Sequence, residues 1–206
     1  CGGTGCTSSG CQQIMEALQA ELAKNGLTEE VSVVQTGCHG LCALGPIVIV
    51  YPEATFYSMV KPEYIPEIVS EHLLKGRVVK KYVYEDTVQE NEEALKPLHE
   101  TDFYKKQHRI ALRNCGVINP ENIEEYIGTR GYEALGKVLT EMTPDDVIKC
   151  ILDSGLRGRG GGGFPTGRKW QLAKDLVKGG QKYVACNADE GDPGAFMDRS
   201  VLEGDP

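Results

Sequence analysis

Two close pairs of cysteines stand at the start of this 206-residue chain, each on a glycine-rich stretch. Cys1 and Cys6 are separated by four residues, Cys38 and Cys42 by three, and residues 7–37 lie between the pairs. Thiolates grouped in this way hold iron–sulfur clusters or zinc, and glycine lets backbone N–H groups approach bound sulfur. We therefore predict one metal centre shared by both pairs. Zinc and unmetallated thiols stay open as alternatives on spacing alone.

Cys11 repeats the same four-residue spacing with Cys6 and so competes with Cys1 for the first position. We favour Cys1, because position 11 falls inside a predicted helix whereas Cys1 enters the loop directly. His39 is expected to be a loop residue rather than a ligand. The other three cysteines stand among apolar neighbours and are predicted to be small buried side chains without chemistry: Cys115, Cys150 and Cys186.

A glycine-rich stretch is the second unusual feature, because seven of the thirteen residues from Gly155 to Gly167 are glycine. The spacing of three of them satisfies a dinucleotide fingerprint, but the stretch follows a predicted helix instead of a strand, and no acid stands about 20 residues later. A P-loop is disfavoured because Gly167 precedes Arg-Lys. A loop without side chains, flanked by cations and aromatic residues, favours a flat phosphorylated ligand. The flanking residues are Arg157, Arg159, Phe164, Arg168, Lys169 and Trp170.

An acidic turn follows a predicted buried strand over residues 182–187. Its polar residues are Asn187, Asp189, Glu190 and Asp192. Side chains at the carboxyl end of a strand commonly face ligands in α/β proteins, and carboxylates suit ribose or ribityl hydroxyls. The competing interpretation is a capped acidic turn around Pro193 and Gly194.

The patterns of apolar residues predict an α/β fold. A helix over 8–24 with Ser8 or Ser9 as its cap, strands over 31–34, 47–51 and 55–60, and a helix over 62–76 form a small layer that lacks one strand before Cys1. Residues 85–108 are rich in acids and lack a core period. Helices are then predicted over 120–126, 131–142 and 143–152. We expect a domain over 1–85, an acidic linker over 86–110 and an incomplete second domain over 111–206.

Composition and charge exclude several classes of protein. The chain is 40 % hydrophobic and 25 % charged, which is an ordinary globular composition, and its formal net charge is −8. The negative charge disfavours nucleic acid as a partner, and the lack of a long apolar run argues against membrane insertion. With no signal peptide and no initiator Met, the chain is expected to be a cytoplasmic piece of a longer protein.

The two cysteine pairs, on this order of helices and strands, resemble the thioredoxin-like [2Fe-2S] ferredoxin domain of NADH-dehydrogenase-type complexes. The resemblance covers about residues 1–85. It implies that Cys1 and Cys6 on one loop, and Cys38 and Cys42 on the other, each ligate the cluster.

The glycine-rich stretch and the acidic turn together resemble the FMN- and NADH-binding domain of the same complexes. The resemblance implies that NADH and flavin are bound by Gly158, Gly160, Gly161, Gly162, Gly163, Phe164 and Lys169, and that Asn187, Asp189 and Glu190 hold FMN. Asp192 stands where the family commonly has Glu, and we include it in the nucleotide site. The three-cysteine [4Fe-4S] loop of the family is expected only beyond Pro206.

The fusion of the two regions resembles the diaphorase subunit of soluble NAD(P)-linked iron hydrogenases and formate dehydrogenases more than respiratory complex I, which stays an alternative. It implies exchange of electrons between NAD(H), FMN and iron–sulfur centres, with hydrogenase or dehydrogenase subunits as partners. Hydride transfer needs no acid or base, so no catalytic residue is assigned. A zinc-stabilised phospholigand-binding module without redox activity is the alternative of another class. A thioredoxin-type oxidoreductase is disfavoured because the Cys-x-x-Cys pair is missing.

Overall fold

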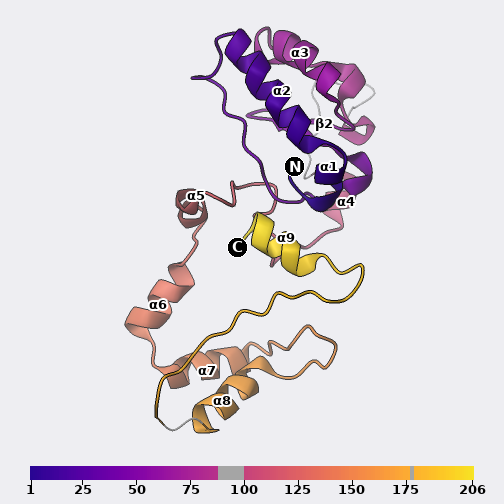
Figure 1. Ribbon diagram of the computed structural model, residues 1–206. Helices are drawn as coiled ribbons and strands as arrows, with labels where there is room; N and C mark the ends of the chain where they lie inside the picture. The colour runs from indigo at the N-terminus through magenta and orange to yellow at the C-terminus, as the bar shows by residue number, and fades with distance from the viewer. Residues whose placement is uncertain (88–99, 177–178) are drawn as a thin grey trace. The chain divides into compact units, whose positions relative to one another are not determined.

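The computed structural model describes residues 1–87, 100–176 and 179–206 (Figure 1). These residues form two compact units, one made of Cys1–Glu125 with Asp189–Pro206 and the other of Tyr126–Ala188. The first unit carries both cysteine pairs, and the second carries the glycine-rich stretch. Within the described ranges, every helix is too short or too polar to span a bilayer.

The first unit begins with two helices where the apolar pattern predicts one. Helix α1 is Thr4–Ser8 and helix α2 is Cys11–Lys24. The predicted serine cap is wrong, because Gly10 is the N-cap of α2, in the left-handed region at φ 89°, and no side chain caps the helix. Glycine adopts this conformation at little cost, so the chain turns between the two helices. Cys11 is consequently the first residue of α2.

The hairpin predicted after residue 47 is confirmed. Strand β1, Val48–Val50, pairs antiparallel with β2, Thr55–Tyr57, so that Val48 lies opposite Tyr57. The predicted strand over 31–34 is wrong, because these residues belong to no strand. A strand needs a neighbour to complete its hydrogen bonds, and among the described residues the sheet contains β1 and β2 alone.

The helix predicted over 62–76 is present as three consecutive helical segments. They are η2 (Pro62–Tyr64), α3 (Ile65–Glu67) and the π-helical η3 (Ile68–Leu73). Gly76, at φ 66°, follows the last turn, as predicted.

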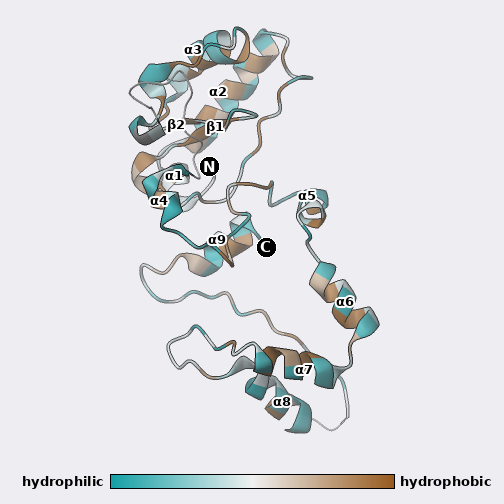
Figure 2. Ribbon diagram, turned by 180° about the vertical axis from the view of Figure 1, so that it is seen from behind, coloured by the Kyte–Doolittle hydropathy of each residue, from teal (hydrophilic) through white to brown (hydrophobic). Residues whose placement is uncertain are grey.

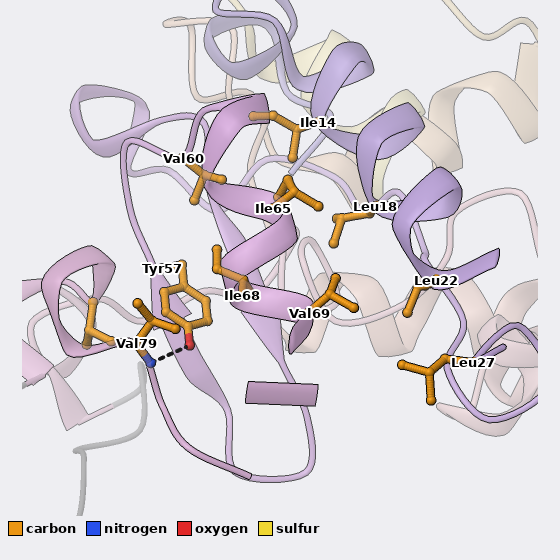
Figure 3. Close-up of a cluster of buried hydrophobic side chains, with 11 residues drawn as sticks. Ile14, Leu18, Leu22, Leu27, Tyr57, Val60, Ile65, Ile68, Val69 and Val79 are labelled. Carbon is orange, nitrogen blue, oxygen red and sulfur yellow. Dashed lines mark hydrogen bonds between the residues drawn. The ribbon is translucent and has the colours of Figure 1, made fainter. Parts of the chain in front are cut away.

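The core of the first unit lies between α2 and this second helical stretch (Figure 3). The predicted apolar face of α2 is buried, since Ile14, Leu18 and Leu22 all belong to the core cluster. They share that cluster with Ile65, Ile68 and Val69, all of which are fully buried. Burial of each such side chain stabilises the fold by about 1.5–3 kcal/mol.

Short elements complete the first unit. They are η1 (Cys42–Leu44), η4 (Lys80–Tyr82), η5 (Glu85–Thr87), α4 (Asp102–Lys105) and α9 (Met197–Gly204). Helix α5, Ile123–Gly128, runs across the boundary between the units. Half of the acid-rich segment over 85–108, residues 88–99, lies outside the described residues.

The second unit consists of helices and loops. Its helices are α6 (Glu133–Glu141), α7 (Pro144–Asp153) and α8 (Thr166–Leu176). The predicted start of α7 is confirmed, because Thr143 and Asp146 form a reciprocal capping box. Figure 2 shows hydrophobic and hydrophilic residues alternating along α6 and α7.

Two predictions in the later part of the chain are wrong. Residues 182–187 are extended and exposed instead of forming a buried strand, and Val184 is fully exposed. No described strand runs beside them. Cys150 and Cys186 are exposed, and only Cys115 of the three scattered cysteines is buried.

A buried network of hydrogen bonds around His72 is expected to make the stability of the fold depend on pH. The hydroxyl of Tyr57 lies 2.9 Å from Nδ1 of His72 and accepts a hydrogen bond from the Val79 amide at 3.2 Å. Burial lowers the pKa of His72 below its usual 6.5. The unfolded chain therefore binds a proton more readily, so this contribution is present above pH 6.5 and is lost as the pH falls.

We expect urea unfolding to show a loss of stability between pH 7 and pH 5 that shrinks in the His72→Gln variant. Each unit of pKa depression corresponds to about 1.4 kcal/mol. An equal pH dependence in both proteins would contradict this role of His72.

Candidate functional site

The two cysteine pairs pack directly against each other in the first unit. The expectation that Cys6 lies on a loop is wrong, because Gly5 and Cys6 belong to helix α1 and Gly3 is its N-cap. The name "cysteine loops" is kept here for residues 1–6 and 37–45. A Cβ atom placed on Gly3 would lie 2.8 Å from Cβ and 3.0 Å from Sγ of Cys38, and one placed on Gly5 would lie 3.2 Å from Cβ of Cys42. A Cβ on Gly45 would lie 2.8 Å from Sγ of Cys6. A side chain at Gly3 or Gly45 would therefore displace a cysteine, and one at Gly5 would fit only tightly. The predicted convergence of both loops is visible in these contacts.

Backbone hydrogen bonds join the loops as well. The Gly2 amide donates to the Thr36 carbonyl at 2.8 Å, and the Gly40 amide donates to Sγ of Cys38 at 3.3 Å. An amide that points at sulfur stabilises negative charge there. Gly40 adopts φ 83°, so this donor depends on a residue without a side chain.

The environment of the thiols opposes their ionisation in the absence of a cation. Cys6 is 2 % exposed, and its burial raises the pKa of its thiol. Partial desolvation of its thiol also raises the pKa of Cys42, although the residue is exposed, and the nearby Cys38 adds to this effect because two thiolates repel. A bound metal ion removes both penalties at once, since it replaces the lost hydration and neutralises the charges.

The donor set fits a thiolate-ligated iron–sulfur cluster by its chemistry and by the cradle of glycines around it. Within residues 1–87, 100–176 and 179–206, no three His, Cys, Asp or Glu side chains already stand in the geometry of a metal site. The thiols are neighbours, and the cluster would have to draw them together.

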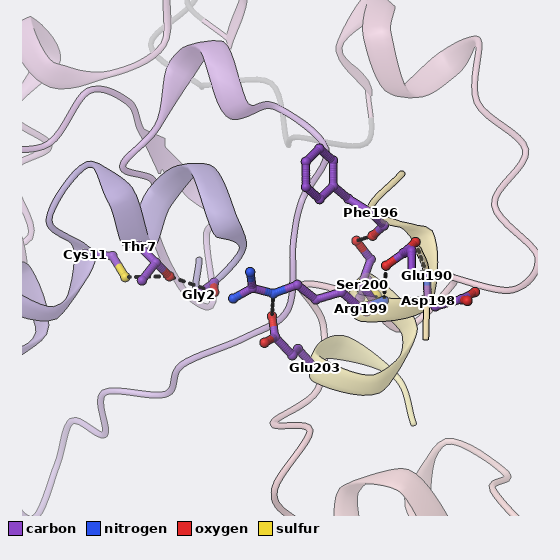
Figure 4. A network of polar contacts seen from close by, with 10 residues as sticks. Gly2, Thr7, Cys11, Glu190, Phe196, Asp198, Arg199, Ser200 and Glu203 are labelled. Atoms are coloured by element: carbon purple, nitrogen blue, oxygen red, sulfur yellow. Dashed lines mark hydrogen bonds and ion pairs between the residues drawn. The ribbon is translucent and has the colours of Figure 1, made fainter. Parts of the chain in front are cut away.

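Cys11 does not border the cavity that Cys38 and Cys42 line. It is buried, and its Sγ lies 3.8 Å from Oγ1 of Thr7 (Figure 4). Together with Cys1 it borders a cavity of about 450 Å³ whose walls include Ile14 and Val48. The choice between Cys1 and Cys11 as the fourth ligand stays a prediction.

Residues from the middle of the chain support the back of the second cysteine loop. The Tyr104 hydroxyl donates to the carbonyl of His39, whose ring lies 3.3 Å from Oγ1 of Thr36. A Cβ on Gly116 would lie 2.5 Å from the His39 ring. Burial is the main cause that lowers the pKa of His39 to about 4, so the ring is neutral at pH 7. These contacts were not predicted from the sequence, because Tyr104 and Gly116 belong to no recognisable sequence motif.

The glycine-rich stretch forms a hairpin-like loop in the second unit. Its base is closed by hydrogen bonds from the Gly158 amide to the Phe164 carbonyl at 2.9 Å and from the Thr166 amide to the Leu156 carbonyl at 3.0 Å. At the tip, a Cβ on any of the residues 160–163 would meet nothing within 4 Å. The loop therefore has a fixed base and an open, side-chain-free tip.

Helix α8 begins at the end of this loop. Its Gly167 packs on α7, where a Cβ would lie 2.7 Å from the backbone nitrogen of Leu152. Lys169 and Trp170 are exposed in the first half of the helix, and Phe164 is exposed in the loop. Cations in the first turn oppose the helix dipole, so their presence there favours a bound anion.

The acidic turn is partly used by the fold. The Glu190 carboxylate accepts hydrogen bonds from the amides of Asp198 at 2.8 Å and Arg199 at 3.0 Å, which lowers the pKa of Glu190 and caps helix α9 (Figure 4). The Asp192 carbonyl accepts from the Ala195 amide at 3.1 Å. These contacts favour the competing interpretation of a capped turn for Glu190. Asn187 belongs to the second unit and Asp189 to the first, and their roles stay predictions.

Comparison with known proteins identifies both regions. Residues 1–73 match the family described as thioredoxin-like [2Fe-2S] ferredoxin, and residues 151–206 match the Nuo51 FMN-binding domain. These matches confirm the predicted order of a [2Fe-2S] region followed by an FMN-binding region.

Curated relatives include the NADP-reducing hydrogenase subunit HndC of Solidesulfovibrio fructosivorans, 66 % identical over 52 % of this chain and 21 % of the relative. An NADH-quinone oxidoreductase subunit of Rhizobium meliloti is 47 % identical over 47 % of this chain and 23 % of the relative. The chain thus spans about a fifth of the length of these relatives. Among solved structures, a thioredoxin-like [2Fe-2S] ferredoxin from Aquifex aeolicus is 34 % identical, with a TM-score of 0.37, over 38 % of this chain and 77 % of its own.

Because Gly3 lies against Cys38, a side chain at position 3 is expected to lower the stability of the first unit. We expect Gly3→Ala to destabilise the first unit by about 1–3 kcal/mol, because its Cβ would press on Cys38. Urea unfolding followed by circular dichroism measures the change. Gly2→Ala is the matched control beside it, since the atoms nearest to its Cβ belong to the flexible Gln35 side chain. Equal stability of the two variants would show that the loops do not press on each other at Gly3.

Proposed function

We propose that this chain transfers electrons between NAD(H) and iron–sulfur centres. The premise is that residues 1–73 are a thioredoxin-like [2Fe-2S] ferredoxin region and that residues 151–206 are part of a Nuo51 FMN-binding domain. The observation that carries the proposal is the contact of the two thiol loops through Gly3 and Gly5. We propose domains over 1–85 and 111–206, joined by the segment 86–110.

The two regions would bind different groups. Cys1, Cys6, Cys38 and Cys42 would hold the [2Fe-2S] cluster, and the glycines beside them would let the backbone approach it. The open tip of the loop at residues 160–163, with Phe164 and Lys169, would receive the phosphates and rings of NADH and FMN. When bound, FMN exchanges a hydride with nicotinamide and single electrons with iron–sulfur centres.

The names of the relatives support the proposal that the protein has partner subunits. The relatives are named as subunits of a hydrogenase and of NADH-quinone oxidoreductases. We propose that the parent protein of this chain is likewise one subunit of such an assembly, in the cytoplasm. The high identity to HndC supports the hydrogenase assignment over the respiratory one.

Substitution of single cysteines tests the cluster. We expect chain purified without oxygen to contain iron and sulfide in equal amounts and to absorb visible light. Cys6→Ser and Cys42→Ser should abolish the absorbance, because each removes a proposed ligand.

Two cysteines serve as controls. Cys150→Ser should leave the absorbance intact, since its thiol is exposed in the second unit. Cys11→Ser should also leave it intact if Cys1 is the fourth ligand, whereas its loss would assign Cys11. A colourless protein that contains zinc would overturn the proposal in favour of the zinc-stabilised module.

Removal of the charge of Lys169 tests whether the glycine-rich loop binds NADH. We expect Lys169→Gln to weaken NADH binding about fivefold, since a charge-assisted hydrogen bond to phosphate contributes about 1 kcal/mol. Titration of NADH fluorescence measures the dissociation constant. The control is Lys149→Gln on α7, which removes a cation paired with Asp153. Equal affinities of both variants would exclude Lys169 from the site.

A further inference from the structure

Helix α9 contacts the second cysteine loop, although the two are far apart in sequence. A Cβ placed on Gly37 would lie 2.4 Å from Cα of Gly204, so the two backbones touch. Both glycines are buried. Large side chains could not occupy either position without separating the helix from the loop.

Two further contacts fix the end of α9. The Asp205 carboxylate accepts hydrogen bonds from the backbone amide and the side-chain amide of Asn114, each at 3.1 Å. The buried Cys115 donates from Sγ to the Ser200 carbonyl at 3.5 Å. Helix α9 is thus held by the segment that also supports His39.

A cavity of about 300 Å³ lies between α9 and the thiols. Cys38 and Cys42 border it on one side, and Phe196, Arg199 and Glu203 border it on the other. Figure 4 shows the Arg199 guanidinium directed from α9 toward the loop at Gly2.

The α9 wall of the cavity carries one positive and one negative charge. Nε of Arg199 lies 2.9 Å from Oε2 of Glu203, and both side chains are about half exposed. A partly exposed pair contributes little to stability. Its two charges nevertheless act on any negative charge held at the thiols, and they act with opposite sign.

We propose that α9 covers the Cys38 side of the cysteine site, where Cys42 stays exposed, and that Arg199 and Glu203 are positioning residues that set the electrostatic potential at the thiols. This is an interaction surface between the FMN-domain region and the [2Fe-2S] region. The part that concerns reduction rests on the proposed function, whereas the covering of the thiols does not.

The charge pair is tested by equilibrium titration of the loaded chain with dithionite, followed by electron paramagnetic resonance. We compare the proteins at the midpoint reduction potential of the wild type. There, Arg199→Gln should lower the ratio of reduced to oxidised cluster about threefold to tenfold, because the positive charge of Arg199 no longer stabilises the added electron. Glu203→Gln should raise the ratio. Tenfold corresponds to about 59 mV for one electron.

The opposite signs separate an electrostatic role from a structural one. Arg77→Gln is the matched control, since Arg77 pairs with Glu71 in the same unit and does not border the cavity. Shifts of the same sign in Arg199→Gln and Glu203→Gln, or no shift in either, would overturn this part of the proposal.

The cover is tested on the iron-free chain by the rate at which iodoacetamide alkylates Cys38, measured by mass spectrometry. In Gly204→Leu a Cβ would lie 2.7 Å from Sγ of Cys115, so α9 must move and the rate should rise at least threefold. Asp205→Asn is a milder variant that weakens the contact with Asn114 and should raise the rate in the same direction.

Gly136→Leu in α6 is the control, because a Cβ there would meet nothing within 4 Å. Circular dichroism verifies that each variant is folded. Unchanged alkylation of Cys38 in both α9 variants would overturn the cover. If the chain holds no iron and sulfide, the proposed function fails, and the alkylation rates still decide whether α9 covers the thiols.

Discussion

The close contact of Gly3 and Gly5, at the start of helix α1, with the cysteines of the second loop is the constraint on which the cysteine site depends. Gly3 and Gly5 bring their backbone against Cys38 and Cys42, and even a methyl group would meet the facing cysteine. The core between α2 and the helical stretch at residues 62–73 holds the two loops at one end of the unit. The glycine contacts therefore bring the backbone of each cysteine pair against a cysteine of the other.

The second cysteine loop is also supported from outside the thioredoxin-like region. Tyr104 binds the carbonyl of His39, Gly116 packs on the ring of His39, and Gly204 touches Gly37. These contacts satisfy a buried carbonyl and exclude water from a neutral imidazole. The region that matches the ferredoxin family is thus not an independent module at this loop, and later segments complete its surroundings.

The glycines of the glycine-rich stretch have different surroundings from the glycines beside the cysteines. Its glycines at residues 160–163 face open space, whereas Gly3, Gly5 and Gly37 face neighbouring atoms. The first arrangement leaves room for a ligand, and the second lets two parts of the protein meet. The same residue type therefore leaves an open loop tip at residues 160–163 and allows close packing at the cysteine pairs.

Local signals alone determined much of this protein: the apolar face of α2, the hairpin of β1 and β2, the capping box of Thr143 and the two motifs that resemble known families. Such features depend on neighbours a few residues apart. The tertiary structure decided the rest. Residues 31–34 and 182–187 have strand-like sequences but no strand beside them among the described residues, and Glu190 caps α9. The place of Arg199 beside the thiols likewise depends on contacts across the fold, which spacing along the chain does not encode.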